Sequence, residues 1–279
     1  MTADQNQPRQ VAFLGPAGTF SHSAVLAYFG HNIDLRECPS IDDVFMVVES
    51  GSVDYGVVPV ENSTEGTVNN TMDCLVDTPL KIVAEIVVPI EHHLMSIDET
   101  AIGNIEVIYS HQQSFAQCRK WLAKHFPGVR TEESPSNAAA AQQALQNPKS
   151  AAIAGKMAAD VTGLKILESS IQDQRDNSTR FIVIGKSDNV PTGNDKTSVL
   201  IYTENRPGAL FRILEPFETY QVSLTRIETR PSRVEAWDYV FFMDFEGHIA
   251  DEAVKNVLAK LEDRTVEVKW LGSFPRARK

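Results

Sequence analysis

Short apolar runs alternate with stretches of helical periodicity along the first two thirds of the chain. The run Val11 to Gly15 precedes the turn Pro16 to Thr19, and apolar residues then recur at helical spacing from Ala24 to Phe29, which predicts strand, turn and helix. Further strands are expected at residues 55–59, 82–88, 107–109, 151–154 and 165–168, and further helices at 41–50, 67–76, 115–126, 137–145 and 156–162. Such alternation indicates an α/β fold with a largely parallel sheet.

The number of predicted elements fits two α/β lobes better than one. The last apolar run of this part, Phe181 to Gly185, is expected to return to the first lobe, which leaves a hinge and a cleft between the lobes. The first domain is therefore predicted at residues 9–188, with lobe 1 at about 9–88 and 176–188 and lobe 2 at about 89–175.

The periodicity changes after Ser187 to Asp195, a segment rich in proline, glycine, asparagine and aspartate that has the composition of a linker. Beyond it, strands are predicted at 197–202, 223–228, 237–245 and 266–271 and helices at 208–220 and 251–261. Their order, β-α-β-β-α-β, is that of a ferredoxin-like domain, placed here at 196–274. Its helices should cover one face of the sheet, and we expect the other face to be free to pack against a second copy.

The charge balance narrows the choice of partners. Asp and Glu number 37 against 26 Lys and Arg, a formal net charge of −11 without a basic stripe, so we expect no nucleic-acid partner. A small anion would have to be captured by local positive potential. No apolar stretch approaches about 18 residues and the first ten residues are polar, so we expect neither a membrane span nor a signal peptide and place the protein in the cytoplasm.

The cysteines form an odd, widely spaced set: Cys38, Cys74 and Cys118. They include no Cys-x-x-Cys pair, which argues against both a disulfide framework and a structural zinc site. We predict reduced thiols that are buried or half-buried.

A polar cluster leads directly into the apolar run that begins at Phe181. It spans Asp176 to Arg180 and supplies an amide, two hydroxyls and a guanidinium at the mouth of a buried strand. Arg180 could hold a carboxylate through two parallel hydrogen bonds, while Asn177 and Thr179 could reach uncharged oxygens of the same molecule. The cluster suits a small anionic, hydroxylated organic acid. Taken alone, it could also be a capped turn before an edge strand.

A glycine-rich turn, Gly15 to Ser21, leads into the first predicted helix. The unpaired N–H groups around Gly18 and Thr19 and the positive end of the helix dipole favour an anion there. The turn has neither the lysine of a P-loop nor the glycine spacing of a dinucleotide site, so we expect no nucleotide. A plain N-cap by Thr19 or Ser21 stays open as the alternative.

The segment Val58 to Thr67 again places polar groups after an apolar strand and before a helix. A desolvated Glu61 would stay protonated and could donate a hydrogen bond; otherwise it only accepts, which is the interpretation we favour. Asn62 and Ser63 are expected to contact the ligand.

Hydrogen-bonding side chains from the opposite lobe are expected at Ser110 to Gln113, after the strand at 107–109. His92 and His93 are adjacent, so on a strand they point to opposite faces and cannot both bind one metal. We expect one to face the cleft or core and the other to face water. Without metal-ligand spacing or a Ser–His–acid order, we predict neither a metal site nor a covalent intermediate.

Each motif is short, but their order and spacing together resemble the prephenate dehydratase family over nearly the whole chain. The matching segments are Gly15 to Ser21, Val58 to Ser63, His92 to Leu94, Ser110 to Gln113 and Asn177 to Phe181, with Pro207 to Leu210 and Glu228 to Pro231 matching the family's ACT domain. The resemblance implies a two-lobed catalytic domain similar to periplasmic binding proteins and an ACT domain that senses phenylalanine. The chain departs from the family pattern at two positions: Gln112 stands where proline is usual, and Thr229 stands where serine is usual. Both departures are mild, because Gln113 is kept and threonine keeps the hydroxyl.

The resemblance also implies the chemistry. Prephenate would lose its ring carboxylate as CO2 and its ring hydroxyl as water to give phenylpyruvate, and because aromatisation drives the reaction, no cofactor is expected. Thr179 would donate a hydrogen bond to the leaving hydroxyl, with Arg180 anchoring a carboxylate and Glu61 as the reserve acid. The residues expected to bind or orient the substrate are Gly18, Thr19, Asn62, Ser63, Ser110, Gln113, Asn177, Ser178 and Phe181.

Regulation is implied in the same way. The carboxylate of a phenylalanine effector would rest on the N–H groups of the turn at Gly208, with ordinary turn chemistry in a dimerisation module as the alternative. The residues expected to bind it are Asn205, Pro207, Gly208, Ala209, Leu210, Glu228, Thr229 and Arg230. We expect a homodimer or homotetramer formed through ACT domains. Only ten residues precede the first strand, so we expect a monofunctional enzyme without a chorismate mutase domain.

Two rival functions stay open. A cytoplasmic sensor could use the same two-lobed fold to bind a small acid without converting it. Thr179 beside Arg180 favours chemistry, because a pure binder needs no donor aimed at a leaving group. An arogenate dehydratase would act on the amino analogue of the same ring, and nothing in the sequence separates a preference for a keto group from one for an ammonium group.

Overall fold

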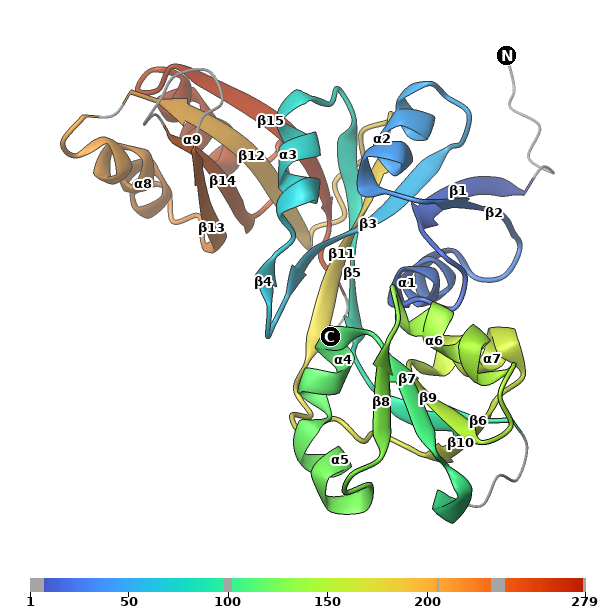
Figure 1. The fold of residues 1–279 in the computed structure, drawn as a ribbon. Coiled ribbons are helices and arrows are strands. Elements are labelled where there is room, and N and C mark those ends of the chain that lie inside the picture. The colour runs from blue at the N-terminus through green and yellow to red at the C-terminus, as the bar shows by residue number, and fades with distance from the viewer. Residues whose placement is uncertain (1–7, 98–101, 205, 232–238, 278–279) are drawn as a thin grey trace. The chain divides into compact units, whose positions relative to one another are not determined.

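The computed structural model describes residues 8–97, 102–204, 206–231 and 239–277 (Figure 1). By packing, the chain divides into two compact units, Met1–Met72 with Ile86–Phe181 and Asp73–Glu85 with Ile182–Lys279. The segment Asp73–Glu85 thus lies within the predicted first domain along the chain but packs with the C-terminal part.

The first sheet has the strand order β2-β1-β3-β11-β5, with the short β4 paired to β3. Its strands are β1 (Arg9–Leu14), β2 (Ile33–Cys38), β3 (Tyr55–Asn62), β4 (Gly66–Thr67), β5 (Lys81–Pro89) and β11 (Ser178–Gly185), and its helices are α1 (Phe20–Phe29), α2 (Ile41–Glu49) and α3 (Asn69–Asp77). β11 lies between β3 and β5, which confirms that the late apolar run returns to the first lobe. β2 was not predicted, because four of its six residues are exposed on the sheet edge and give no apolar signal.

The second sheet has the order β10-β6-β9-β7-β8. Its strands are β6 (His93–Ser96), β7 (Val107–Ser110), β8 (Arg130–Glu133), β9 (Ser150–Ala154) and β10 (Lys165–Glu168); its helices are α4 (Gln112–Gln117), α5 (Arg119–His125), α6 (Asn137–Ala144) and α7 (Lys156–Thr162), and a 3-10 turn spans Ile102–Asn104. The expectation of a largely parallel sheet holds for β7 with β8 and β9, but β6 runs antiparallel to both β9 and β10.

Helices cover both faces of this second sheet (Figure 1). Small alanines of α6 and α7 pack on one face against Met95 and Ala152, while larger side chains of α4 and α5 pack on the other against Leu94 and Ile153. The single helix predicted at 115–126 is in fact two helices, because the helical conformation is interrupted at Cys118.

The C-terminal sheet has the order β13-β14-β12-β15, and its neighbouring strands are antiparallel. Its elements are β12 (Asp195–Thr203), α8 (Ala209–Thr219), β13 (Leu224–Pro231), β14 (Tyr239–Glu246), α9 (Glu252–Glu262) and β15 (Glu267–Pro275). The predicted β-α-β-β-α-β order is confirmed, although the start of the predicted strand 237–245 lies outside the described residues. Val199, Ile201 and Met243 form one core with α8 and α9, so both helices lie on the same face.

The opposite face of this sheet is not free, contrary to expectation. Strand alternation places Leu200 and Phe242 on it, and both are buried. Residues of the segment Asp73–Glu85 lie against this face and its edge. They contact it through Lys269, whose ammonium donates to the carbonyls of Leu75, Val76 and Thr78, and through the ion pairs Lys196–Glu85 and Arg230–Asp73.

Candidate functional site

The end of β3 and the start of β11 are joined residue to residue. The Ser63 N–H donates to the Ser178 carbonyl at 2.9 Å, and the Ser178 N–H donates back to the Ser63 hydroxyl at 3.0 Å. The Ile90 N–H holds the carbonyl of Asn177 at 2.9 Å. These contacts hold two polar segments, more than a hundred residues apart in sequence, side by side.

Asn62 is the centre of the site. Its side-chain nitrogen donates to the Asn177 carbonyl oxygen Oδ1 at 3.0 Å and to the Thr179 hydroxyl at 2.8 Å. Its own oxygen accepts from the N–H groups of Thr64 at 2.9 Å and Glu65 at 3.0 Å, so the turn between β3 and β4 fixes the amide. The structure therefore brings Asn62, Asn177 and Thr179 together.

The Thr179 hydroxyl accepts a hydrogen bond from Asn62, and the described contacts include no acceptor for its own hydrogen. Thr179 is buried and lies beside Arg180, which is half-buried in β11. A hydroxyl that receives one hydrogen bond and keeps its proton free is arranged as a donor.

Gln117, at the end of α4, was not predicted as a site residue. Its side-chain oxygen accepts from the Asn177 amide at 3.1 Å and lies 2.8 Å from His92 Nε2. The predicted residue was Gln113, one helical turn earlier, but Gln113 is exposed, and in the described contacts it takes part through its main-chain N–H, which donates to His111 Nδ1. Its spacing of four residues from Gln113 could have indicated Gln117, since α4 returns to the same side after about 3.6 residues per turn.

Both histidines of the adjacent pair are buried, at 2% exposure for His92 and 6% for His93. The expectation that one of them faces water is wrong. His93 Nδ1 accepts from the Ser170 N–H at 3.2 Å. Burial lowers the pKa of His92 and of His93, so both rings favour the neutral form.

The glycine-rich turn is a helix cap in this structure. The Thr19 hydroxyl accepts from the His22 N–H and donates to the Leu14 carbonyl, and the Gly18 N–H donates to His22 Nδ1 at 3.2 Å. Gly18 has φ +91° and would place a Cβ 3.2 Å from the Ala158 backbone, so the two lobes approach closely here. Both residues are thus engaged locally, and their contact with a substrate stays a prediction.

The remaining predicted residues take different positions. Ser110 is fully buried, and its hydroxyl donates to the Ile153 carbonyl at 2.8 Å, which ties β7 to β9 rather than reaching the Asn62 group. Glu61 is half-buried in the β3–β4 pair, and Phe181 is buried in β11.

The predicted effector residues lie on two elements of the C-terminal domain. Gly208, with φ +79°, precedes α8, and Leu210 and Phe211 are exposed at its start. Thr229 is exposed on β13, whereas Arg230 is bound by Asp73. Asn205 lies outside the described residues.

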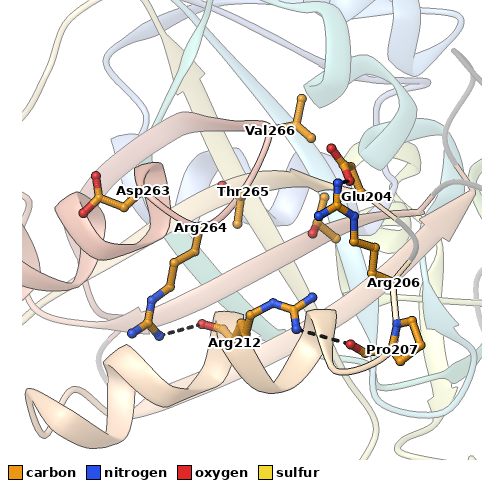
Figure 2. A pocket seen from close by; sticks show the side chains of 9 residues that line it. Glu204, Arg206, Pro207, Arg212, Asp263, Arg264, Thr265 and Val266 are labelled. Carbon is orange, nitrogen blue, oxygen red and sulfur yellow. Dashed lines mark hydrogen bonds and ion pairs between the residues drawn. The ribbon is translucent and has the colours of Figure 1, made fainter.

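A cavity of about 680 Å³ adjoins the Pro207 turn (Figure 2). Three guanidinium groups line it, of which Arg212 donates to the Pro207 carbonyl at 3.2 Å and Arg264 to the Arg212 carbonyl at 3.2 Å. The full lining is Thr203, Glu204, Arg206, Pro207, Arg212, Asp263, Arg264, Thr265 and Val266. The cavity therefore presents both signs of charge.

Within the described ranges, no group of His, Cys, Asp and Glu has the arrangement of a metal site, and no helix is long and apolar enough to cross a membrane. No disulfide joins the three cysteines, which all lie in the described ranges; Cys38 and Cys118 are buried and Cys74 is half-buried, as predicted. Burial raises the pKa of Cys118 to about 12.

A family model described as prephenate dehydratase matches residues 11–189, which include the whole Asn62 group. The chain belongs to the prephenate dehydratase family. It is an enzyme of the hydro-lyase class, with a catalytic domain of two α/β lobes and a C-terminal ACT domain, whose family model matches residues 197–263.

Relatives agree with this prephenate dehydratase assignment. The bifunctional chorismate mutase/prephenate dehydratase of Stutzerimonas stutzeri is 49% identical over 271 residues, covering 97% of this chain and 74% of that protein. The prephenate dehydratase of Arthrobacter aurescens, solved in complex with L-Phe, has a TM-score of 0.88 at 34% identity and covers 96% of this chain and 90% of its own. A protein described as a novel type of quorum quenching acylase also has a TM-score of 0.88, at 26% identity. The match covers 96% of this chain and 98% of that protein's chain.

Proposed function

We propose that the protein converts prephenate to phenylpyruvate, CO2 and water, with a catalytic domain at residues 9–188 and an ACT regulatory domain at 196–274 that responds to phenylalanine. The observation that carries the proposal is the state of Thr179. Its hydroxyl accepts from Asn62 at 2.8 Å, and none of the described contacts uses its own hydrogen. Arg180 is the next residue in β11.

The reaction needs little more than binding and one donated hydrogen bond. The bond to the ring carboxylate breaks and leaves CO2, its electron pair enters the ring, and the ring C–O bond breaks as hydroxide takes up a proton to become water. The gain in aromaticity drives these steps, so the protein has to hold the dianion and assist the leaving hydroxide.

Arg180 suits the anchoring role, because a guanidinium can bind a carboxylate through two parallel hydrogen bonds. Thr179 suits the assisting role as a hydrogen-bond donor rather than as a free acid, because an alcohol ionises poorly near neutral pH. The proton that completes the water then comes through Thr179 from solvent or from Glu61, which is the reserve acid. Asn62, Asn177, Ser63 and Ser178 would orient the substrate.

Phenylalanine is the proposed effector, and its proposed contacts remain Asn205, Pro207 to Leu210 and Glu228 to Arg230. The L-Phe complex of the Arthrobacter aurescens relative supports this choice. An amino acid carries a carboxylate and an ammonium group, and the cavity beside Pro207 presents both arginines and acidic side chains. We also propose that the protein associates through its ACT domains into a homodimer or homotetramer.

The test is incubation of the purified chain with prephenate. We expect phenylpyruvate, detected by its absorbance in alkali, at a rate that phenylalanine lowers. Arogenate is assayed in parallel, and the ratio of the two kcat/KM values decides the preferred substrate. Cleavage of an N-acyl amide without phenylpyruvate formation would favour the acylase activity named for the structural relative and would overturn the proposal.

A further inference from the structure

The hydrogen-bond directions in the Asn62 group are fixed from one end. The N–H groups of Thr64 and Glu65 can only donate, so the Asn62 atom that faces them must be the oxygen. Its nitrogen then supplies both hydrogens of the other side, one to Asn177 Oδ1 and one to the Thr179 hydroxyl.

The orientation of the Asn62 amide in turn fixes the orientation of the Asn177 amide. Asn177 Oδ1 accepts from Asn62 and lies 3.3 Å from the Ser63 hydroxyl, which donates to it. The other end of the Asn177 amide is therefore the nitrogen, and it donates to Gln117 Oε1 at 3.1 Å. Gln117 must present its oxygen at this point.

The last member of this series of hydrogen bonds is His92. Its Nε2 lies 2.8 Å from the same Gln117 oxygen, so Nε2 must carry a hydrogen. Its main chain is fixed on both sides, since its N–H donates to Gln172 at 3.0 Å and its carbonyl accepts from Ile171 at 2.8 Å. The ring contacts Phe20 edge to face, with centroids 5.8 Å apart.

His92 Nδ1 is buried and has no hydrogen-bond partner among the residues that the structure describes. An unsatisfied buried acceptor costs free energy, so a ring held in this tautomer needs a compensating contact. The contact present is the bond from Nε2 to Gln117.

We infer that His92 is a positioning residue: it donates from Nε2 to Gln117, and through Gln117, Asn177 and Asn62 it keeps the Thr179 hydroxyl hydrogen free for the substrate. Without this donor, Gln117 can rotate its amide by half a turn and present its nitrogen to Asn177. That reversal places two donors face to face and displaces the Asn177 amide, and with it the Asn62 nitrogen that bonds to the Thr179 hydroxyl. The kinetic part of this inference rests on the proposed function.

The tautomer can be measured without any reaction. In protein labelled with 15N-histidine, couplings between ring nitrogens and ring carbon-bound protons report which nitrogen is protonated. The His92 signals, assigned by their loss in His92→Leu, are expected to show a protonated Nε2 and a bare Nδ1. A protonated Nδ1 with a bare Nε2 would overturn the inference.

The kinetic test compares three variants. His92→Leu removes the donor and should lower kcat by about 10–100-fold with little change in KM, since the loss acts through misplacement of Thr179. His92→Gln returns an amide N–H roughly where Nε2 lies and should restore most of kcat. His93→Leu is the matched control, because His93 is its buried neighbour, while among the described contacts its ring bonds to the Ser170 N–H and not to the Asn62 group.

The outcomes separate the two claims. Equal losses in His92→Leu and His93→Leu, or no rescue by His92→Gln, would show that His92 acts only in packing. If the unmodified chain does not act on prephenate at all, the proposed function fails, and the nitrogen couplings alone decide the tautomer.

Discussion

Two polar networks of this molecule hold distant segments together by different means. The Asn62 group in the first unit consists of amides, hydroxyls and a neutral imidazole, all within hydrogen-bond distance. In the second unit, the contacts between Asp73–Glu85 and the ACT sheet use charged side chains, among them Lys196, Arg230 and Lys269.

The difference follows from what each network has to specify. Neutral amides have a donor end and an acceptor end, so a series of hydrogen-bonded amides determines the direction in which a hydroxyl hydrogen, here that of Thr179, points. Charged groups attract over a longer range with less dependence on angle, and they weaken as salt is added. The first network is suited to chemistry, and the second to holding a segment of the catalytic domain against the regulatory sheet with an adjustable strength.

The largest effect is expected where the neutral network ends. Thr179→Val keeps the shape of the side chain but removes the hydroxyl, and it should lower kcat about 10²–10⁴-fold, the usual contribution of a positioned donor. KM should change little, because Arg180, the proposed carboxylate anchor, is unchanged. Thr179→Ser, which keeps the hydroxyl, is the control, and steady-state kinetics with prephenate give both constants. A valine variant with near-normal kcat would remove Thr179 from the chemistry.

The parts of this arrangement that could be predicted are those with a local signal. Apolar runs gave the buried strands β3, β9 and β11, and the polar residues that follow or precede them gave Asn62, Asn177 and Thr179. The edge strands β2 and β8 were missed because they lack that signal: β8 reads Arg-Thr-Glu-Glu and is mostly exposed.

The remaining features depend on partners far away in sequence. Gln117 looks like any polar residue on a helix until Asn177 and His92 are placed beside it. Lys269, likewise, has the pattern of a solvated strand residue, and its real partners are carbonyls more than 190 positions earlier. No local pattern encodes such a pairing, so the cover over the second face of the ACT sheet could not be predicted.

Within the second unit, Gly272 lies very close to the main chain of Ile82, and of the changes considered in this unit its substitution should have the largest effect on stability. A Cβ there would lie 2.2 Å from the Ile82 carbonyl oxygen, and φ is +148°. Because main chain cannot move aside cheaply, Gly272→Ala should cost about 3 kcal/mol or more of unfolding free energy.

Gly193→Ala separates strain from collision, since Gly193 has φ +84° with open space around it. It should cost only about 1–2 kcal/mol. Urea denaturation of the two variants gives both values, and equal losses would mean that the contact with Ile82 is not close in solution.

A smaller loss is expected at Lys269. Its ammonium donates to the carbonyls of Val76 at 2.6 Å and Thr78 at 2.7 Å, at the C-terminal end of α3, where a cation also meets the negative end of the helix dipole. Lys269→Met should therefore lower the unfolding free energy by about 1.5–3 kcal/mol. Lys255→Met, at an exposed position of α9, is the control and should stay within about 0.5 kcal/mol of the parent in the same titration.

The smallest effect, and the one that most directly separates the two networks, concerns Arg230 and Asp73. Their charged atoms lie 2.5 Å apart and the side chains are 20% and 28% exposed, so solvent screens them partly. A double-mutant cycle with Arg230→Gln and Asp73→Asn should give a coupling of about 1 kcal/mol in low salt. In about 1 M NaCl, where the screening length falls to about 3 Å, most of this coupling should disappear.

The neutral network provides the comparison for that salt series. An Asn62→Leu variant should lose the same factor in kcat at both salt concentrations, because no formal charge takes part in the bonds it breaks. If phenylalanine binds near Arg230, it competes with Asp73 for the guanidinium, and added salt should weaken inhibition while the uninhibited kcat stays constant. A kcat that falls with salt in parallel with the Arg230–Asp73 coupling would mean that the two networks act as one and that the contrast between them is wrong.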